Sequence, residues 1–137
     1  LPLGRTGRRP RGAQMSLLIE RSGEVTRVKG DVRAIGDRFG YGPPTFTERR
    51  FLLGANDRAY LFSDGIIHQF GGENGKKKFS YARLTELVQG LTDLDQENSL
   101  RHVSTTFQNW KNEMEQTDDV LLIGFSLRGL IHQSNAA

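Results

Sequence analysis

The sequence predicts an α+β protein in which a mostly antiparallel sheet carries helices packed on one face. Three observations lead to this fold class. Strand-like segments separated by turns fill the first half, two adjacent segments with helical spacing follow, and one further apolar strand comes last. Because helices do not alternate regularly with strands, a doubly wound parallel sheet is disfavoured. The length of 137 residues suits one domain with a modest core.

The first half of the chain predicts two hairpins. Residues 15–20 (MSLLIE) and 25–28 (VTRV) have strand composition and are separated by the turn-forming residues 21–24. Residues 29–45 are rich in glycine, contain Pro43 and Pro44, and predict a loop. A second pair of strands is expected over residues 46–53 and 58–63, joined by a turn at 54–57.

Two helices are predicted after Gly75. In the first, Ser80 is a candidate N-cap, and the apolar residues at helical spacing are Leu84, Leu87, Val88 and Leu91. In the second, Asp93 or Asp95 is a candidate N-cap. Steps of three and four residues place five apolar residues on one face, namely Leu100, Val103, Phe107, Trp110 and Met114. The last element expected is a strand over residues 118–127, whose continuous apolar run is typical of burial on both faces.

The net charge of +3 does not describe the domain. Residues 1–12 contain four arginines and no acid, and without them 15 Lys+Arg stand against 16 Asp+Glu, a net charge of −1. We therefore expect a basic, disordered tail rather than specific nucleic-acid binding. A weaker nucleic-acid hypothesis would use this tail together with Lys76, Lys77 and Lys78.

The chain has no cysteine, which excludes disulfides, thiolate zinc sites and a cysteine nucleophile. No apolar run approaches the ~18 residues of a membrane span, and the N-terminus lacks the apolar core of a signal peptide. We expect a cytoplasmic setting without membrane contact. The glycine-rich residues 71–78 do not match a phosphate-binding Walker A loop and predict a solvated loop.

Acidic residues stand at the ends of two predicted strands. Asp64 follows the strand at 58–63, and Asp118 and Asp119 open the strand at 118–127. If these strands are antiparallel neighbours, the carboxylates meet at one end of the sheet. There they repel each other unless a cation intervenes, and Mg²⁺ or Mn²⁺ prefers such oxygen ligands. The alternative at each site alone is ordinary turn or loop chemistry, because Asp-Gly is a common turn pair.

Several short motifs, taken together and in their order along the chain, resemble the C-terminal half of a SpoIIE-like phosphatase. Such proteins belong to the PPM class of metal-dependent serine/threonine phosphatases. The motifs are Ser-Asp-Gly at 63–65, Gln-Phe-Gly-Gly at 69–72, Lys-Phe at 78–79, Trp110 and Asp-Asp at 118–119. Upstream, residues 12–18, 22–25 and 34–36 resemble the family's preceding hairpin and loop.

This resemblance implies a β-sandwich flanked by helices, with two Mn²⁺ or Mg²⁺ ions at one end. It places Asp64 and Asp118 on metal-ligand positions, and Asp119 on a neighbouring position where many relatives carry Asn. It implies hydrolysis of phosphoserine or phosphothreonine by a metal-activated water, so that no protein nucleophile is needed. The implied partner is a phosphorylated regulatory protein of bacterial signalling, such as an anti-sigma-factor antagonist of the STAS type.

The chain departs from the family pattern in two ways. It has neither the Gly-His-Gly element nor the metal-binding aspartates of the family's N-terminal half. We therefore expect a basic tail at 1–11, the C-terminal part of a phosphatase domain at 12–128, and a frayed end at 129–137. Relatives also usually carry Asp where this chain has His68, which adds no negative charge when neutral.

These departures keep a second hypothesis open, namely a non-catalytic interaction module that retains the phosphatase fold. For either function, the missing portion would expose apolar strand surface beside residues 120–123. Self-association into a homo-oligomer, a swapped partner or poor solubility is therefore expected.

Overall fold

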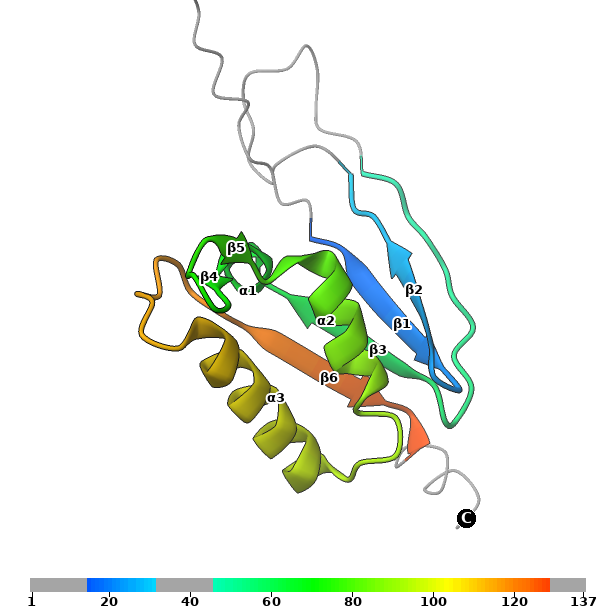
Figure 1. The fold of residues 1–137 in the computed structure, drawn as a ribbon. Helices are drawn as coiled ribbons and strands as arrows, with labels where there is room; N and C mark the ends of the chain where they lie inside the picture. Colours follow the sequence, from blue (N-terminus) through cyan, green and yellow to red (C-terminus); the bar gives the residue numbers. More distant parts are fainter. Residues whose placement is uncertain (1–14, 32–45, 129–137) are drawn as a thin grey trace, which may run out of the picture.

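The computed structural model describes residues 15–31 and 46–128 and builds them into one α+β unit (Figure 1). Its elements, in order, are β1 (Leu17–Arg21), β2 (Glu24–Val28), β3 (Arg58–Phe62), α1 (Asp64–His68), β4 (Phe70–Gly71), β5 (Lys77–Lys78), α2 (Ser80–Gln89), α3 (Gln96–Lys111) and β6 (Leu122–Ser126). The tail predicted at 1–11, most of the loop at 29–45 and the end at 129–137 lie outside the described residues.

A four-stranded antiparallel sheet in the order β2-β1-β3-β6 forms the centre of the fold. The predicted first hairpin is confirmed. Its two-residue turn is Ser22-Gly23, and both residues have positive φ, 51° and 84°, as a tight turn matched to the strand twist requires. Helices α2 and α3 lie on the same face of this sheet (Figure 1). The predicted fold class, an antiparallel sheet with helices on one face, is confirmed. Within the described residues this sheet is a single layer, beside the small β4–β5 ribbon.

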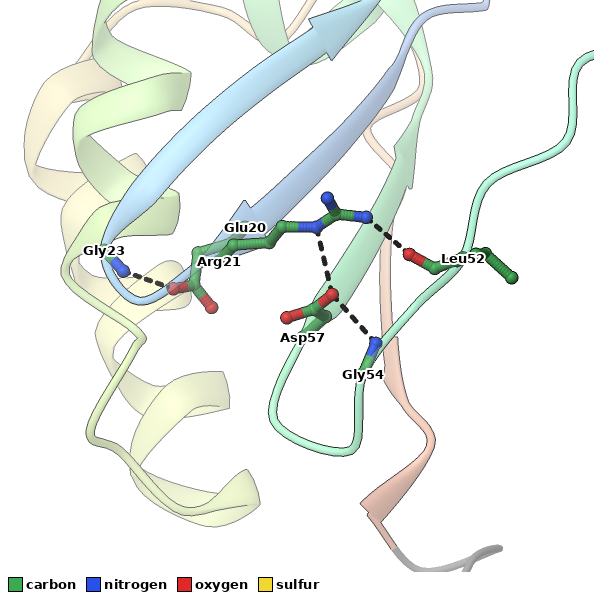
Figure 2. A network of polar contacts seen from close by, with 6 residues as sticks. All are labelled: Glu20, Arg21, Gly23, Leu52, Gly54 and Asp57. Carbon is green, nitrogen blue, oxygen red and sulfur yellow. Dashed lines mark hydrogen bonds and ion pairs between the residues drawn. The ribbon is translucent and has the colours of Figure 1, made fainter.

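The second predicted hairpin is wrong, because residues 46–53 form no strand. The partners of β3 are β1 on one side and β6 on the other, so no edge of β3 remains for this segment. Phe51 and Leu52 are also exposed, Leu52 at 93%, and give the segment no apolar face to bury. Polar contacts hold it instead (Figure 2). Arg21 donates to the Leu52 carbonyl over 2.5 Å.

The last strand is shorter and more exposed than predicted. Strand β6 covers Leu122–Ser126 and lies at the edge of the described sheet, so it is not buried on both faces. Leu122 pairs with the buried Phe62 and packs against the core. Ile123 and Phe125 point to the opposite face and are 46% and 45% exposed. The apolar run was therefore a correct signal for a strand but not for its position in the sheet.

Helix α2 matches its prediction on the apolar face but not at its cap. Leu84, Leu87, Val88 and Leu91 are all buried. Ser80 is not the N-cap, because it is the first helical residue and its preceding neighbour Phe79 makes no side-chain cap. Phe79 is 1% exposed and instead packs in the core against Phe107 and Trp110.

Helix α3 carries a narrower buried face than its sequence suggests. Phe107 is buried, and Val103 and Trp110 pack against the core. Leu100 is 72% exposed, and Met114 lies beyond the end of the helix. The C-terminal end of α3 is held against the α1–β4 connection. There the Trp110 carbonyl accepts from the Gly72 amide at 2.9 Å, and its indole donates to the Gln69 carbonyl at 3.3 Å.

Three groups of polar contacts fix the end of the sheet where the β1–β2 turn lies. Glu20 faces the helices and is 1% exposed, and its Oε1 accepts from the Gly23 amide at 2.7 Å and from the Thr92 hydroxyl at 3.2 Å (Figure 2 shows the first of these). Arg21, which points to the other face, forms an ion pair of 3.0 Å with Asp57. Arg58 donates to the Leu91 and Leu94 carbonyls and so ties the α2–α3 connection to β3.

In the described ranges, none of the helices combines the length and the apolar character that crossing a membrane requires.

Asp95, one of the two predicted caps, caps α3. Its carboxylate accepts hydrogen bonds from the Asn98 amide and side chain, each at 2.8 Å, and these bonds hold the pKa of Asp95 below its ordinary value of 3.8. Because the folded pKa is lowered, this stabilisation is present above the unfolded pKa and is lost as pH falls through the folded pKa. We predict that Asp95→Ala lowers the Tm at neutral pH, and that the difference from wild type shrinks in acid.

The Tm can be followed by circular dichroism across this pH range. Asp93→Ala serves as the matched control, because Asp93 is an exposed carboxylate in the same connection. An equal loss in both variants, or a loss from Asp95→Ala that does not depend on pH, would contradict the capping role.

Candidate metal centre

The two acidic segments predicted to meet are brought together at one end of the sheet. Strand β3 ends at Phe62 and β6 begins at Leu122, and these two residues are paired. Asp64 follows β3 directly, and Asp118 precedes β6 by a few residues. The antiparallel arrangement that the metal hypothesis required is therefore present.

Ser63 joins the two segments. Its amide donates to the Leu121 carbonyl at 3.0 Å. Its hydroxyl donates to the Asp119 carbonyl at 2.8 Å and accepts from the Leu121 amide at 2.9 Å. One short side chain therefore satisfies two backbone groups of the neighbouring segment. We call these three bonds the Ser63 clamp.

Gly65 allows the two segments to approach this closely. A Cβ at this position would lie 2.9 Å from the Asp119 carbonyl carbon, closer still to its oxygen, and 3.4 Å from the Asp118 carbonyl carbon. Real side chains do not tolerate such distances to backbone atoms. Asp64-Gly65 is thus no hairpin turn. The pair opens the short helix α1, in which Ile66 and Ile67 are buried.

The carboxylates themselves remain largely in solvent. The Asp64 side chain is 56% exposed, and Asp118 and Asp119 are exposed. Asp118 Oδ1 accepts from the Asp119 amide at 2.8 Å, and Gln116 donates to the Asp118 carbonyl at 3.0 Å. These bonds shape the loop before β6 and hold the Asp118 carboxylate at the sheet end.

His68 lies one helical turn after Asp64 and contacts it. The Nδ1 atom is 3.8 Å from Asp64 Oδ2, and the imidazole is 38% exposed. The residue that departs from the family pattern is therefore a direct neighbour of a candidate ligand. Unlike the Asp that relatives usually carry there, its imidazole adds no negative charge to the site.

The donor type of this site fits a hard divalent cation, but the number of donors is small. Mg²⁺ commonly binds through one or two carboxylates and keeps several waters, so Asp64 and Asp118 can form part of such a site. Across residues 15–31 and 46–128, no group of three or more His, Asp or Glu side chains is arranged to hold a metal ion. Metal binding by Asp64 and Asp118 stays a prediction.

Ser63 is a site residue to which sequence reasoning assigned no role. The motif Ser-Asp-Gly pointed to the aspartate, while the serine was treated only as the end of a strand. A residue that both donates and accepts, next to an acid at a strand end, is the signal that could have identified the clamp.

Comparisons with known proteins agree with this geometry. A family model described as Stage II sporulation protein E (SpoIIE) matches residues 11–128. The solved SiaA-PP2C domain of Pseudomonas aeruginosa is similar in structure, with a TM-score of 0.72 and 25% sequence identity. The match covers 82% of this chain and 43% of that chain, so the chain spans less than half of the solved domain. No curated protein sequence matches.

The close approach at Gly65 predicts a large effect of one methyl group. Gly65→Ala should lower the free energy of unfolding by about 1–3 kcal/mol, because the new Cβ overlaps the Asp119 backbone. Chemical denaturation measures this change. Gly54→Ala is the control, because its Cβ would meet only ordinary contacts at 3.7 Å. Equal stability of the Gly65 variant and wild type would contradict the packing described.

The position of His68 predicts that it limits cation binding. Replacing His68 by Asp adds a carboxylate beside Asp64 and should tighten Mn²⁺ binding by about tenfold. Isothermal titration at neutral pH measures this change, with His68→Asn as the uncharged control. Unchanged affinity in the His68→Asp variant would show that the side chain at 68 does not face the cation.

Proposed function

Because the chain belongs to the SpoIIE family of PP2C-type phosphatase domains, we propose that it forms part of a metal-dependent phosphoprotein phosphatase. The observation that carries this proposal is the Ser63 clamp, which joins the ends of β3 and β6 and so sets Asp64 and Asp118 at one end of the sheet. Family membership supports a phosphatase-type domain, and we assign its chemistry to the sheet end that carries both aspartates.

In this proposal Asp64 and Asp118 hold Mn²⁺ or Mg²⁺. When bound, such ions activate a water molecule and neutralise phosphate charge during hydrolysis of a phosphoserine or phosphothreonine ester. The chain's own residues supply the framework. The clamp and Gly65 fix the spacing between the two segments, and the Gln116 and Asp119 amides shape the loop that carries Asp118.

The proposed substrate is a phosphorylated regulatory protein of bacterial signalling, of which an anti-sigma-factor antagonist of the STAS type is one candidate. This substrate class follows from the family and not from the geometry. The exposure of both carboxylates is compatible with it, because a phosphorylated side chain of another protein can reach them.

A non-catalytic interaction module is the second candidate, and one observation favours it. The described residues contribute two candidate ligands rather than three, and His68 stands beside one of them. On this view the fold binds a regulatory partner without hydrolysis. Metal binding separates the two candidates, because only the phosphatase requires it.

We predict weak Mn²⁺ binding that depends on both aspartates. Asp64→Asn and Asp118→Asn should each weaken it by about tenfold or more, since each removes an anionic oxygen ligand. Asp119→Asn is the matched control, because it removes the same charge from the exposed residue next to Asp118. It keeps the hydrogen bond from the Ser63 hydroxyl, which goes to the backbone carbonyl of residue 119. Titration followed by Mn²⁺ electron paramagnetic resonance measures all four proteins.

The same proteins should show little or no hydrolysis of p-nitrophenyl phosphate, because this sequence lacks the metal-binding aspartates of the family's N-terminal half. Robust metal-dependent hydrolysis by the 137-residue chain would contradict this expectation and favour a complete site. Equal Mn²⁺ affinity in wild type and in the Asp64 and Asp118 variants would contradict the assignment of the ligands.

A further inference from the structure

A basic hollow of about 630 Å³ lies along the outer edge of β2, and we call it the edge hollow. It is lined by Arg27, Val28, Lys29, Arg49, Arg50 and Phe51. Figure 1 shows the segment after residue 46 running beside β2, on the side away from β1. The volume is within the ~300–1,000 Å³ range of ligand sites.

Positive charge dominates this hollow. Of the six described residues that line it, four are cationic and none is acidic. Arg50 has an acidic neighbour, Glu48, at 2.7 Å, but both side chains are more than 70% exposed and the pair is weak. The edge hollow is therefore suited to an anionic ligand.

Arg27 is held in place by its neighbours. Its Nε donates to the buried Ser16 hydroxyl at 3.1 Å, and its guanidinium lies 3.2 Å from the centre of the Tyr81 ring. These contacts order a long side chain before a ligand binds, which reduces the entropy lost on binding. One of the cations that line the hollow is therefore held in place by contacts within the protein.

The wall formed by β2 also offers backbone hydrogen bonds. Strand β2 is at the end of the described sheet, and among the described strands only β1 pairs with it. The other edge of such a strand presents N–H and C=O groups that an extended peptide can pair with. The other wall of the hollow carries Arg49, Arg50 and Phe51. The segment that forms it is tied to the chain after β2, because the Asp31 carboxylate accepts from the Thr47 amide at 2.5 Å.

The edge hollow lies at the same end of the sheet as the candidate metal centre. Leu17 of β1 pairs with Val28 on one side and with Leu61 on the other, so Val28 and Leu61 occupy one row across the sheet. Strands β2 and β3 are both antiparallel to β1 and so run in the same direction. Lys29, which follows Val28, therefore lies toward the same end of the sheet as Ser63, which follows β3. Strands β2 and β3 are separated by one strand, a distance of about 10 Å.

We propose that the edge hollow binds an extended acidic segment of the phosphoprotein substrate, adjacent in sequence to the phosphorylated residue. This inference rests on the proposed function, because that function supplies the substrate. Charge complementarity, the edge of β2 that no described strand pairs with, and the position of the hollow at the same sheet end as Asp64 all favour this occupant. Single-stranded nucleic acid fits less well, because its sites usually stack bases on several aromatic residues, and Phe51 is the one aromatic residue among the described residues that line this hollow.

Fluorescence anisotropy tests the proposal with the full chain and a labelled peptide that carries one phosphoserine followed by a run of glutamates. The titration is done at low ionic strength in EDTA, so that no metal contributes. The double variant Lys29→Ala/Arg49→Ala should bind about 3-fold to 30-fold more weakly, the effect of losing two exposed charge pairs. Both residues are exposed, and an unchanged Tm verifies that the variant folds.

The matched control is Lys76→Ala/Lys77→Ala, which removes the same charge from exposed residues at the β4–β5 ribbon. It should leave the affinity within about twofold of wild type, because screened charges outside the site contribute little. Equal weakening in both double variants would overturn the proposal in favour of a net-charge effect. Tighter binding of a single-stranded oligonucleotide than of the peptide would overturn it in favour of nucleic acid.

These outcomes are independent of the metal experiment. Loss of peptide binding in the Lys29/Arg49 variant supports the edge hollow whether or not Asp64 and Asp118 bind Mn²⁺. Conversely, a failed peptide experiment leaves the Mn²⁺ titration of the aspartate variants unaffected.

Discussion

The arrangement of this protein depends on the contact between the end of β3 and the start of β6. Ser63 satisfies two backbone groups of the neighbouring segment with one hydroxyl, and Gly65 lets the backbones approach within a distance that no side chain permits. The chemistry of the two aspartates is therefore secondary to a packing constraint. Two carboxylates separated by 54 residues in sequence can act together only because a serine and a glycine fix the backbones that carry them.

The sequence was most informative where periodicity and burial agree. Leu84, Leu87, Val88 and Leu91 lie at helical spacing and all are buried, and the hairpin through Ser22-Gly23 follows from turn chemistry alone. It was least informative where a segment's role depends on its neighbours. Residues 46–53 contain strand-forming residues, yet both edges of β3 are taken by β1 and β6. Strand β6 reads as buried because Leu122, Ile123 and Phe125 are apolar, but its burial depends on what covers the sheet.

The candidate site also combines features that the sequence predicts with features that depend on neighbouring segments. The acids at strand ends could be identified from composition, because carboxylates beside apolar runs are conspicuous. The sequence signals a serine that can donate and accept beside Asp64, but not its partners, because these are the Asp119 carbonyl and the Leu121 amide and carbonyl, backbone groups that every sequence contains. Which backbone groups meet is decided by strand register, and register emerges only when all the strands are assembled.

The clamp also has a consequence for how this region can change over generations. Ser63 contacts residues 119 and 121 through main-chain atoms alone, so the identities of their side chains are not constrained by it. Substitutions there can accumulate without disturbing the join, whereas an insertion or deletion of one residue would offer the serine the wrong backbone groups. Positions 119 and 121 should therefore vary in side chain, while Asp118 and the length of the segment before β6 stay fixed.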